Sequence, residues 1–194
     1  MSITSERFAS GFAWAERLHR DQKRKASSIP YVSHLLAVAA LTLEYGGDED
    51  QAIAALLHDA AEDQGGLATL EAIRSDFGDR VADIVAACSD TFETPKPEWR
   101  DRKENFVSDL ESISLDGLLV VAADKLHNAT TMLEDHRVIG AELWLRFTGS
   151  RDQQLWYLKS VAEICSRRLG GDALRLADRL LSVVASLEEE TRTA

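Results

Sequence analysis

Four side chains that can bind a metal ion or move a proton lie within six residues of this sequence: His58, Asp59, Glu62 and Asp63. The residues around them are mostly small or apolar and favour a helix. Residues four apart share a helix face, so His58 pairs with Glu62 and Asp59 with Asp63. The spacing predicts an active-site helix on which one pair of these side chains binds a metal ion and the other pair positions a water molecule.

Two distant segments can complete such a site, because each of them offers one further ligand. The first is Pro30–His34, which puts His34 in the first turn of an expected helix. The second contains Asp124, which directly follows the apolar run Leu118–Ala123 of a helix expected to be buried on nearly all sides. An unpaired buried carboxylate costs several kcal/mol, so Asp124 needs a cation or strong donors beside it.

Asp124 also begins a polar stripe on this otherwise apolar helix. Asn128, Thr131 and Asp135 follow it at intervals of four, three and four residues, which keeps all of them on one face. His127 falls off this stripe, and we expect it to point elsewhere and to be structural.

Apolar residues recur at spacings of three and four along most of the chain, the period of amphipathic helices. We therefore expect an all-α protein, a single-domain bundle of about nine to ten helices over residues 1–194, with the metal site between helices. The expected helices cover residues 4–23, 31–45, 48 or 49 to the Gly65-Gly66 pair, 69–77, 81–88, 99–110, 115–133, 141–147, 152–168 and 172–187. The C-terminal helices, within 141–190, are expected to be scaffold or a partner surface.

Composition excludes several classes of protein. The 194 residues are 45% hydrophobic with only 3 Pro and 11 Gly, which suits a compact helical protein. The first residues lack a signal-peptide pattern, and no apolar run approaches the ~18 residues of a membrane span, so we expect a cytoplasmic protein with no membrane partner. A net charge of −11 disfavours nucleic acid as a partner. A homo-oligomer remains open.

Cysteines and basic residues add two local expectations. Cys88 and Cys165 are far apart, so we expect two buried thiols and neither a disulfide nor a thiolate zinc site. Residues 17–25 carry five basic side chains, which fit either a solvated helix end or a phosphate-binding edge beside the metal. A second basic cluster is more typical of a solvated face; its members are Lys96, Arg100, Arg102 and Lys103.

The order His34, His58-Asp59, Asp124 resembles the HD superfamily of metal-dependent phosphohydrolases. Further motifs over about residues 5–135 look like the hydrolase domain of the RelA/SpoT alarmone enzymes and the small alarmone hydrolases. These motifs are Gln22-Lys23-Arg24-Lys25, Pro30-Tyr31-x-x-His34, Leu56-Leu57-His58-Asp59-x-x-Glu62-Asp63, Phe77-Gly78 and Ala123-Asp124-Lys125-Leu126-x-Asn128.

The resemblance implies an HD-type helical fold and a role for each matching residue. It implies one divalent metal, Mn²⁺, held by His34, His58, Asp59 and Asp124. Glu62 and Asp63 match the pair that positions and activates the attacking water. The residues that match substrate contacts are Arg24, Lys25, Asn128 and Thr131.

The chain departs from this pattern only around the substrate pocket. Members of the family often have an Arg before the threonine and a basic residue soon after it, whereas this chain has Thr130 before Thr131 and Glu134-Asp135 after it. The loop between Lys25 and Pro30 also looks short. These changes leave the hydrolytic residues in place and bear on the identity of the substrate.

The residue types support hydrolysis without reference to a family. Two imidazoles and two carboxylates make a mixed nitrogen and oxygen site, which suits catalytic manganese, iron or zinc better than a closed structural zinc. A metal there can lower the pKa of bound water and polarise a phosphoryl oxygen, and a carboxylate can accept the proton.

Three functions remain open. The first is removal of the 3′-pyrophosphate from ppGpp-like alarmones, small phosphorylated nucleotides. The second is phosphomonoesterase activity on the 2′-phosphate of NADPH or on nucleoside monophosphates. The third is a noncatalytic nucleotide-binding module, against which the Glu62-Asp63 pair argues, because binding alone needs no water-activating carboxylate.

Overall fold

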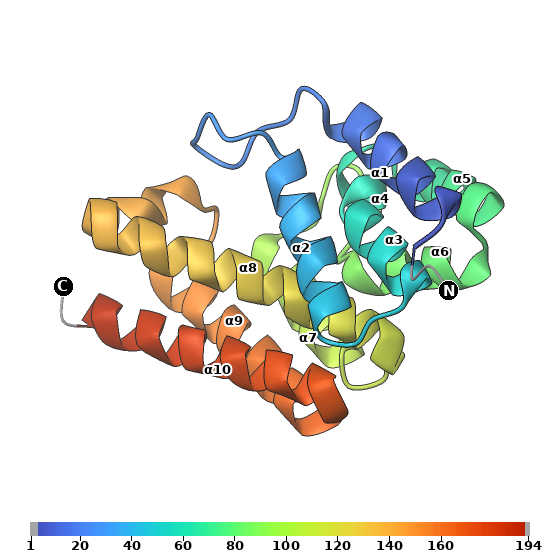
Figure 1. Ribbon diagram of the computed structural model, residues 1–194. Helices are drawn as coiled ribbons and strands as arrows, with labels where there is room; N and C mark the ends of the chain where they lie inside the picture. The colour runs from blue at the N-terminus through green and yellow to red at the C-terminus, as the bar shows by residue number, and fades with distance from the viewer. Residues whose placement is uncertain (1–3, 193–194) are drawn as a thin grey trace.

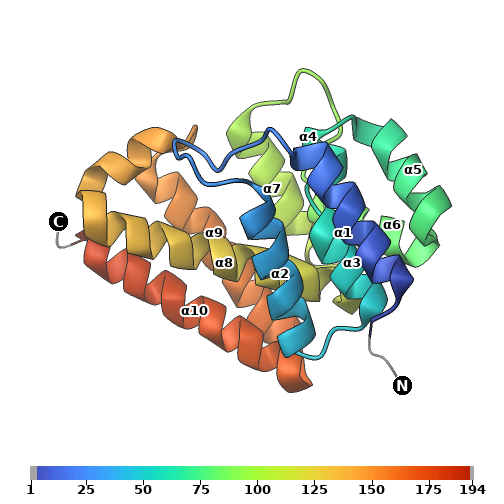
Figure 2. The same cartoon turned by 45° about the horizontal axis from the view of Figure 1, so that its top comes forward.

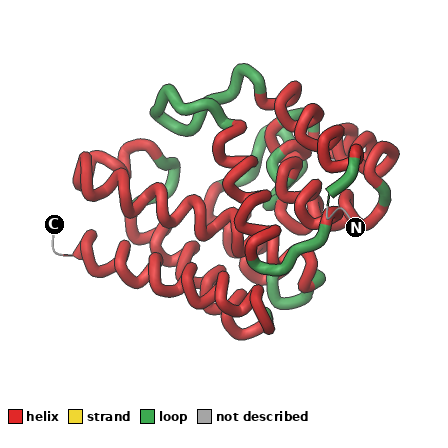
Figure 3. The backbone as a smooth tube through the Cα atoms, viewed as in Figure 1, coloured by secondary structure: helices red, strands yellow, loops and turns green. Residues whose placement is uncertain are grey.

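The computed structural model describes residues 4–192, in which ten α-helices and one 3₁₀ helix are joined by short loops and no β-strand occurs (Figure 3). The helices are α1 (Glu6–His19), α2 (Val32–Glu44), α3 (Glu49–Leu57), α4 (Ala60–Asp63), α5 (Gly66–Phe77), α6 (Asp79–Cys88), α7 (Trp99–Asp109), α8 (Leu115–Ile139), η1 (Gly140–Arg146), α9 (Arg151–Arg168) and α10 (Gly171–Arg192). The all-α prediction is confirmed.

Helix α8 is the central element of the structure. It packs against α2, α3 and α6 on one side and against α9 and α10 on the other (Figure 1). Residues Leu118–Ala123 of α8 are buried, as the apolar run predicts. They join residues of α3 such as Ile53 and Leu56 in one hydrophobic core. A charged side chain on the middle of α8 therefore lies inside the protein.

Capping residues define where several helices begin. Asp48 and Gln51 form a capping box at α3, and Ser150 and Gln153 form another at α9, so that orphan backbone N–H groups find acceptors. Helix α8 runs six residues beyond its predicted end at Leu133 and stops at Gly140, whose φ of +59° ends the helix. The segment predicted as a helix over 141–147 is the 3₁₀ helix η1. No described helix is long and apolar enough to cross a membrane.

The expected active-site helix is two helices, because the chain leaves the α-helix at His58. Helix α3 ends at Leu57, and α4 begins at Ala60. Asp59 has φ −94° and ψ −4°, at the edge of the right-handed helical region. The imidazole of His58 donates from Nδ1 to the carbonyl of Ala55, which satisfies a group at the end of α3. The predicted stacking of residues 58 and 62 on one uninterrupted helix is thus wrong.

Gly117 allows α8 to approach α6 closely. A Cβ at Gly117 would lie 2.8 Å from the Cβ of Ala87, a rigid methyl that cannot rotate away. Gly170, by contrast, has no heavy atom within 4 Å of a built Cβ.

We expect Gly117→Ala to lower the free energy of unfolding by about 1–2 kcal/mol, because overpacking outweighs the gain from removing a helical glycine. The matched control, Gly170→Ala, should stay within about 0.5 kcal/mol of the wild type. Urea denaturation of both variants measures this. An equal effect at both positions would contradict the close approach of α6 and α8.

Candidate metal centre and its pocket

Three separate segments bring four potential ligands together. His34 comes from the first turn of α2, His58 and Asp59 come from the junction of α3 and α4, and Asp124 comes from the middle of α8. Nε2 of His34 lies 3.2 Å from Oδ1 of Asp124 and 3.7 Å from Oδ2 of Asp59. Nε2 of His58 lies 3.0 Å from Oδ2 of Asp59 and 3.7 Å from Oδ1 of Asp124. The predicted convergence of these four side chains is found.

The four side chains fit a divalent metal ion. Nε2 of His34 and Nε2 of His58 are buried and have no hydrogen-bond partner, although both face the same space as the carboxylates. Neighbouring ligand atoms around a metal with bonds of about 2.1 Å are separated by roughly 3.0–3.5 Å. The separations between these atoms lie in or close to that range. A shared ion would therefore satisfy both orphan nitrogens.

Neighbouring groups orient the potential ligands from behind, an arrangement common around metal sites. The Tyr31 hydroxyl donates to Oδ2 of Asp59. Asp124 accepts from the Asn128 amide through Oδ1 and pairs with Lys125 through Oδ2. Tyr31 and Lys125 have supporting contacts that the sequence did not predict, although both lie inside the motifs.

The charges within the cluster explain why it would bind a cation. Burial alone would lower the pKa of His58, but the negative charges of Asp59 and Asp124 beside its Nε2 hold it well above the ordinary value. Burial alone would raise the pKa of Asp124, but Lys125 and the two imidazoles hold it well below the ordinary value. A proton on Nε2 of His58 or a metal ion in its place supplies the positive charge that the two carboxylates need.

His127 also belongs to the site, which corrects the prediction that it points elsewhere. Its Nδ1 lies 2.8 Å from Nδ1 of His34, and its side chain lines the pocket beside the cluster. Burial, His34 and Arg24, in that order, lower the pKa of His127 to about 4, so that its imidazole is neutral at pH 7. The helical period correctly places His127 off the polar stripe. The face of α8 that carries it, however, packs against α2, which bears His34.

Glu62 and Asp63 both contact one lysine. Nζ of Lys96 lies 2.7 Å from Oε1 of Glu62 and 3.4 Å from Oδ1 of Asp63. In Figure 2, the loop before α7 that carries Lys96 comes close to α4. Burial, followed by the nearby Asp90, raises the pKa of Glu62, while Lys96 opposes this shift. Both carboxylates line the same pocket as Asp59.

The second basic cluster is a pocket wall rather than a solvated face, with the exception of Arg100. Arg102 and Lys103 both pair with Asp90, whose side chain is only 2% exposed, and they line the pocket with Lys96. Arg100 stacks on Trp156 at the surface. The buried partner Asp90 lies ten or more residues away in sequence, so helical spacing alone could not indicate this wall.

The first basic run divides into two parts. Arg20 pairs with Glu16 on the surface, whereas Nη2 of Arg24 donates to Oδ1 of Asn128 at 2.7 Å. Lys25 also lines the pocket. Burial lowers the pKa of Lys25, and the surrounding Lys103, Lys96 and Arg102 lower it further. Positive side chains therefore crowd around Lys25 beside the cluster.

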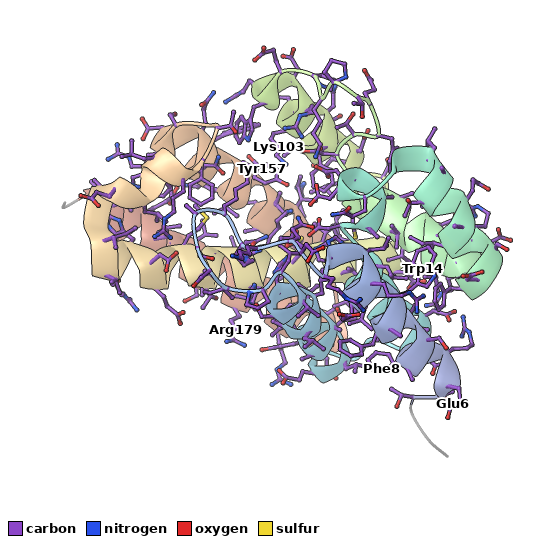
Figure 4. The ribbon with its side chains drawn as sticks, turned by 90° about the horizontal axis from the view of Figure 1, so that it is seen from above. Glu6, Phe8, Trp14, Lys103, Tyr157 and Arg179 are labelled. Atoms are coloured by element: carbon purple, nitrogen blue, oxygen red, sulfur yellow. The ribbon has the colours of Figure 1, made fainter. Side chains whose placement is uncertain are left out.

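The pocket has a volume of about 740 Å³ and extends from the cluster to α9. Thr131 and Tyr157 are among its lining residues, and the Thr131 hydroxyl donates to the carbonyl of His127. Tyr157 of α9 lies next to Lys103 of α7, whose Nζ is 4.7 Å from the ring centroid (Figure 4). Helix α9 was expected to be scaffold or partner surface, and it also forms a wall of the pocket. Cys88 lines the pocket as well, whereas Cys165 is buried as predicted.

Comparison with known proteins identifies the family to which this chain belongs. The model of the HD domain family matches residues 11–143, which include the whole cluster. This chain belongs to the HD domain family. Members of this family bind a divalent metal, and in this HD domain His34, His58 and Asp59 form the candidate site together with the adjacent Asp124.

Similar curated proteins include enzymes of alarmone metabolism. This HD-domain chain is 40% identical over 123 residues to the guanosine-3′,5′-bis(diphosphate) 3′-pyrophosphohydrolase of Xenopus tropicalis, covering 62% of this chain and 65% of the relative. It is 32% identical over 126 residues to a probable enzyme of the same name from Synechocystis, covering 62% of this chain but only 16% of that relative. The chain thus spans a small part of several curated relatives.

Solved structures share the fold over nearly the whole chain. One is a metazoan ortholog of SpoT that hydrolyses ppGpp; it has a TM-score of 0.74 and 25% identity, covering 94% of this chain and 97% of that chain. Another is a protein of Listeria monocytogenes EGD-e, with a TM-score of 0.69 and 30% identity, covering 83% of this chain and 99% of that chain. The helical fold of this HD domain is therefore that of these proteins.

We expect His58→Ala to lose bound divalent metal, because it removes one of the two unpartnered buried imidazole nitrogens from the cluster. The control is His136→Ala, since His136 is also buried but bonds only to the carbonyl of Gly140. Elemental analysis of metal-loaded, desalted protein measures the retained metal. Full retention in His58→Ala would contradict the assignment of this histidine.

Proposed function

We propose that this HD-domain protein is a metal-dependent hydrolase that removes the 3′-pyrophosphate from ppGpp-like alarmones. The observation that carries the proposal is the His34, His58, Asp59 and Asp124 cluster, set in one pocket with a carboxylate pair and two cations, Arg24 and Lys25, that have no carboxylate partner among the described residues. The pyrophosphohydrolase relative from Xenopus tropicalis and the solved SpoT ortholog support the same reaction.

His34, His58, Asp59 and Asp124 would hold one divalent metal, which we propose to be Mn²⁺. Mixed imidazole and carboxylate donors with room for further ligands suit this ion. When bound, the metal would lower the pKa of water and polarise a phosphoryl oxygen. Tyr31, Asn128 and Lys125 would keep the carboxylates directed at it.

Glu62 and Asp63 would position the attacking water and accept its proton. The raised pKa of Glu62 supports this role, because a base whose pKa is closer to neutral transfers protons more effectively at pH 7. Lys96 contacts both carboxylates and can hold the pair in place before the substrate binds. The proton would then leave through solvent at the open side of the pocket.

Arg24, Lys25, Asn128 and Thr131 would bind the substrate. Arg24 and Lys25 have no carboxylate partner within 4.0 Å among the described residues, so their charge is available to a phosphate. Burial is the main cause of the lowered pKa of Lys25, and repulsion from Lys103, Lys96 and Arg102 lowers it further. A pyrophosphate group would relieve this repulsion and form charge-assisted hydrogen bonds.

A second candidate function is removal of phosphate from a less highly charged ester, such as the 2′-phosphate of NADPH or a nucleoside monophosphate. Glu134 and Asp135 line the far part of the pocket, where Arg146 pairs with Asp135 and leaves Glu134 as the carboxylate that would repel a second pyrophosphate. The charge of Glu134 therefore favours this alternative. A noncatalytic binding module is less well supported, because it would not need the partly buried Glu62.

The decisive experiment incubates the manganese-loaded protein with ppGpp, NADPH and nucleoside monophosphates in parallel and identifies the products. We expect release of pyrophosphate from ppGpp, with loss of turnover after metal removal and recovery when metal is restored. If the protein releases inorganic phosphate from NADPH and leaves ppGpp intact, it is a phosphomonoesterase and the alarmone assignment is wrong. No turnover of any substrate would favour the binding module.

We expect Glu62→Gln to lower kcat on the accepted substrate about 100-fold or more, because an amide cannot accept the proton of the attacking water. Bound metal and KM should change little. Glu104→Gln is the control, since Glu104 pairs with Arg100 on the surface. Steady-state kinetics with measured metal content tests this. An unchanged kcat would transfer the role to Asp63.

A further inference from the structure

His127 contacts a potential metal ligand from the side opposite the cluster. Its Nδ1 lies 2.8 Å from Nδ1 of His34, and the two rings are tilted by 41° with centroids 4.9 Å apart. One of these two nitrogens must carry a hydrogen and the other must accept it. The surroundings of His34 decide which one it is.

The cluster determines the tautomer of His34. Nε2 of His34 is buried, faces the two carboxylates and Nε2 of His58, and lacks a hydrogen-bond partner. When Nε2 binds a metal it needs its free electron pair, so the hydrogen of His34 is on Nδ1. His34 therefore donates from Nδ1, and Nδ1 of His127 accepts.

The same reasoning places the hydrogen of His127 on Nε2. Because Nδ1 of His127 accepts the hydrogen bond from His34, it carries no hydrogen, and Nε2–H is the remaining polar group of the ring. Among the described residues, this nitrogen forms no hydrogen bond, and the half-buried side chain lines the pocket. The Thr131 hydroxyl bonds to the carbonyl of His127 one turn along α8.

We propose that His127 has two functions through this single tautomer. Its Nδ1 accepts from His34 and so directs Nε2 of His34 at the metal, and its Nε2–H donates to a phosphoryl oxygen of the substrate. The first function concerns metal binding alone. The second rests on the proposed function, because it requires a phosphorylated ligand in the pocket.

The position of His127 on α8 suits a link between metal and substrate. Asn128 follows it directly and bonds both to Asp124 and to Arg24. One turn of α8 thus contacts two potential metal ligands and one arginine that would bind phosphate. A phosphoryl oxygen near the metal would meet a neutral donor from His127 and a charged donor from Arg24.

Two substitutions separate the two functions. The side-chain amide of asparagine can place an acceptor where Nδ1 lies, but it does not reach the position of Nε2. The amide of glutamine can place a donor near the position of Nε2 without an acceptor at Nδ1. His127→Phe keeps a ring but removes both groups. His136→Asn is the control for a buried histidine outside the pocket.

The measurements are metal affinity, by competition with a chelator, and pyrophosphate affinity of the zinc-saturated protein, by calorimetry. His127→Asn should keep metal affinity near the wild type and weaken pyrophosphate binding about tenfold or more. His127→Gln should weaken metal binding about 10-fold or more and keep pyrophosphate affinity near the wild type. His127→Phe should lose both, and His136→Asn neither. Equal effects of Asn and Gln on both affinities, or no effect of either, would overturn the proposal.

Nitrogen NMR of the zinc-loaded wild type tests the tautomer without a substitution. Nδ1 of His127 should have the chemical shift of an unprotonated nitrogen and Nε2 that of a protonated one; the reverse pattern would overturn the proposal. If the wild type binds no pyrophosphate, the second function of His127 fails, while the proposed hydrolase is decided separately by product release from ppGpp. The NMR and metal affinities still decide the first function, so the two failures are distinguishable.

Discussion

The structure depends on two carboxylates that face two imidazoles inside a helical protein. Asp59 and Asp124 lie within 3.7 Å of the Nε2 atoms of His34 and His58; the side chain of Asp124 is buried and that of Asp59 is partly exposed to the pocket. Two negative charges in such a cluster are costly unless cations and donors surround them. Lys125, Asn128 and Tyr31 supply part of that compensation. The two unpartnered imidazole nitrogens mark where a metal ion would supply the rest.

The junction between α3 and α4 places two adjacent side chains in the cluster. His58 and Asp59 lie between the two helices, and Nε2 of His58 comes 3.0 Å from Oδ2 of Asp59. The hydrogen bond from His58 to Ala55 satisfies a backbone carbonyl at the end of α3 and fixes the imidazole. Buried residues of α3 and α8 on either side of the cluster belong to the hydrophobic core, which holds these segments in place.

The pocket combines a nearly neutral interior with one region of excess positive charge. Asp90 neutralises part of Arg102 and Lys103, and Glu62 and Asp63 neutralise Lys96. Arg24 and Lys25 have no carboxylate partner among the described residues and supply the excess. The acidic residues of the far wall belong to the end of α8, and Tyr157 of α9 closes another side. The walls of the pocket therefore come from elements on both sides of the HD motifs.

The sequence by itself determined the helical class and the four side chains of the cluster, because both depend on local spacing and on motifs within short segments. It also indicated that Asp124 needs a partner, since an apolar run predicts burial. Only the tertiary structure decided the break at His58 and Asp59, the contact of His127 with His34, and the place of Lys96, Arg102 and Lys103 around the pocket. Periodicity assigns a residue to a face of its own helix. Which group packs against that face depends on contacts between segments distant in sequence, and those contacts form only when the helices pack together.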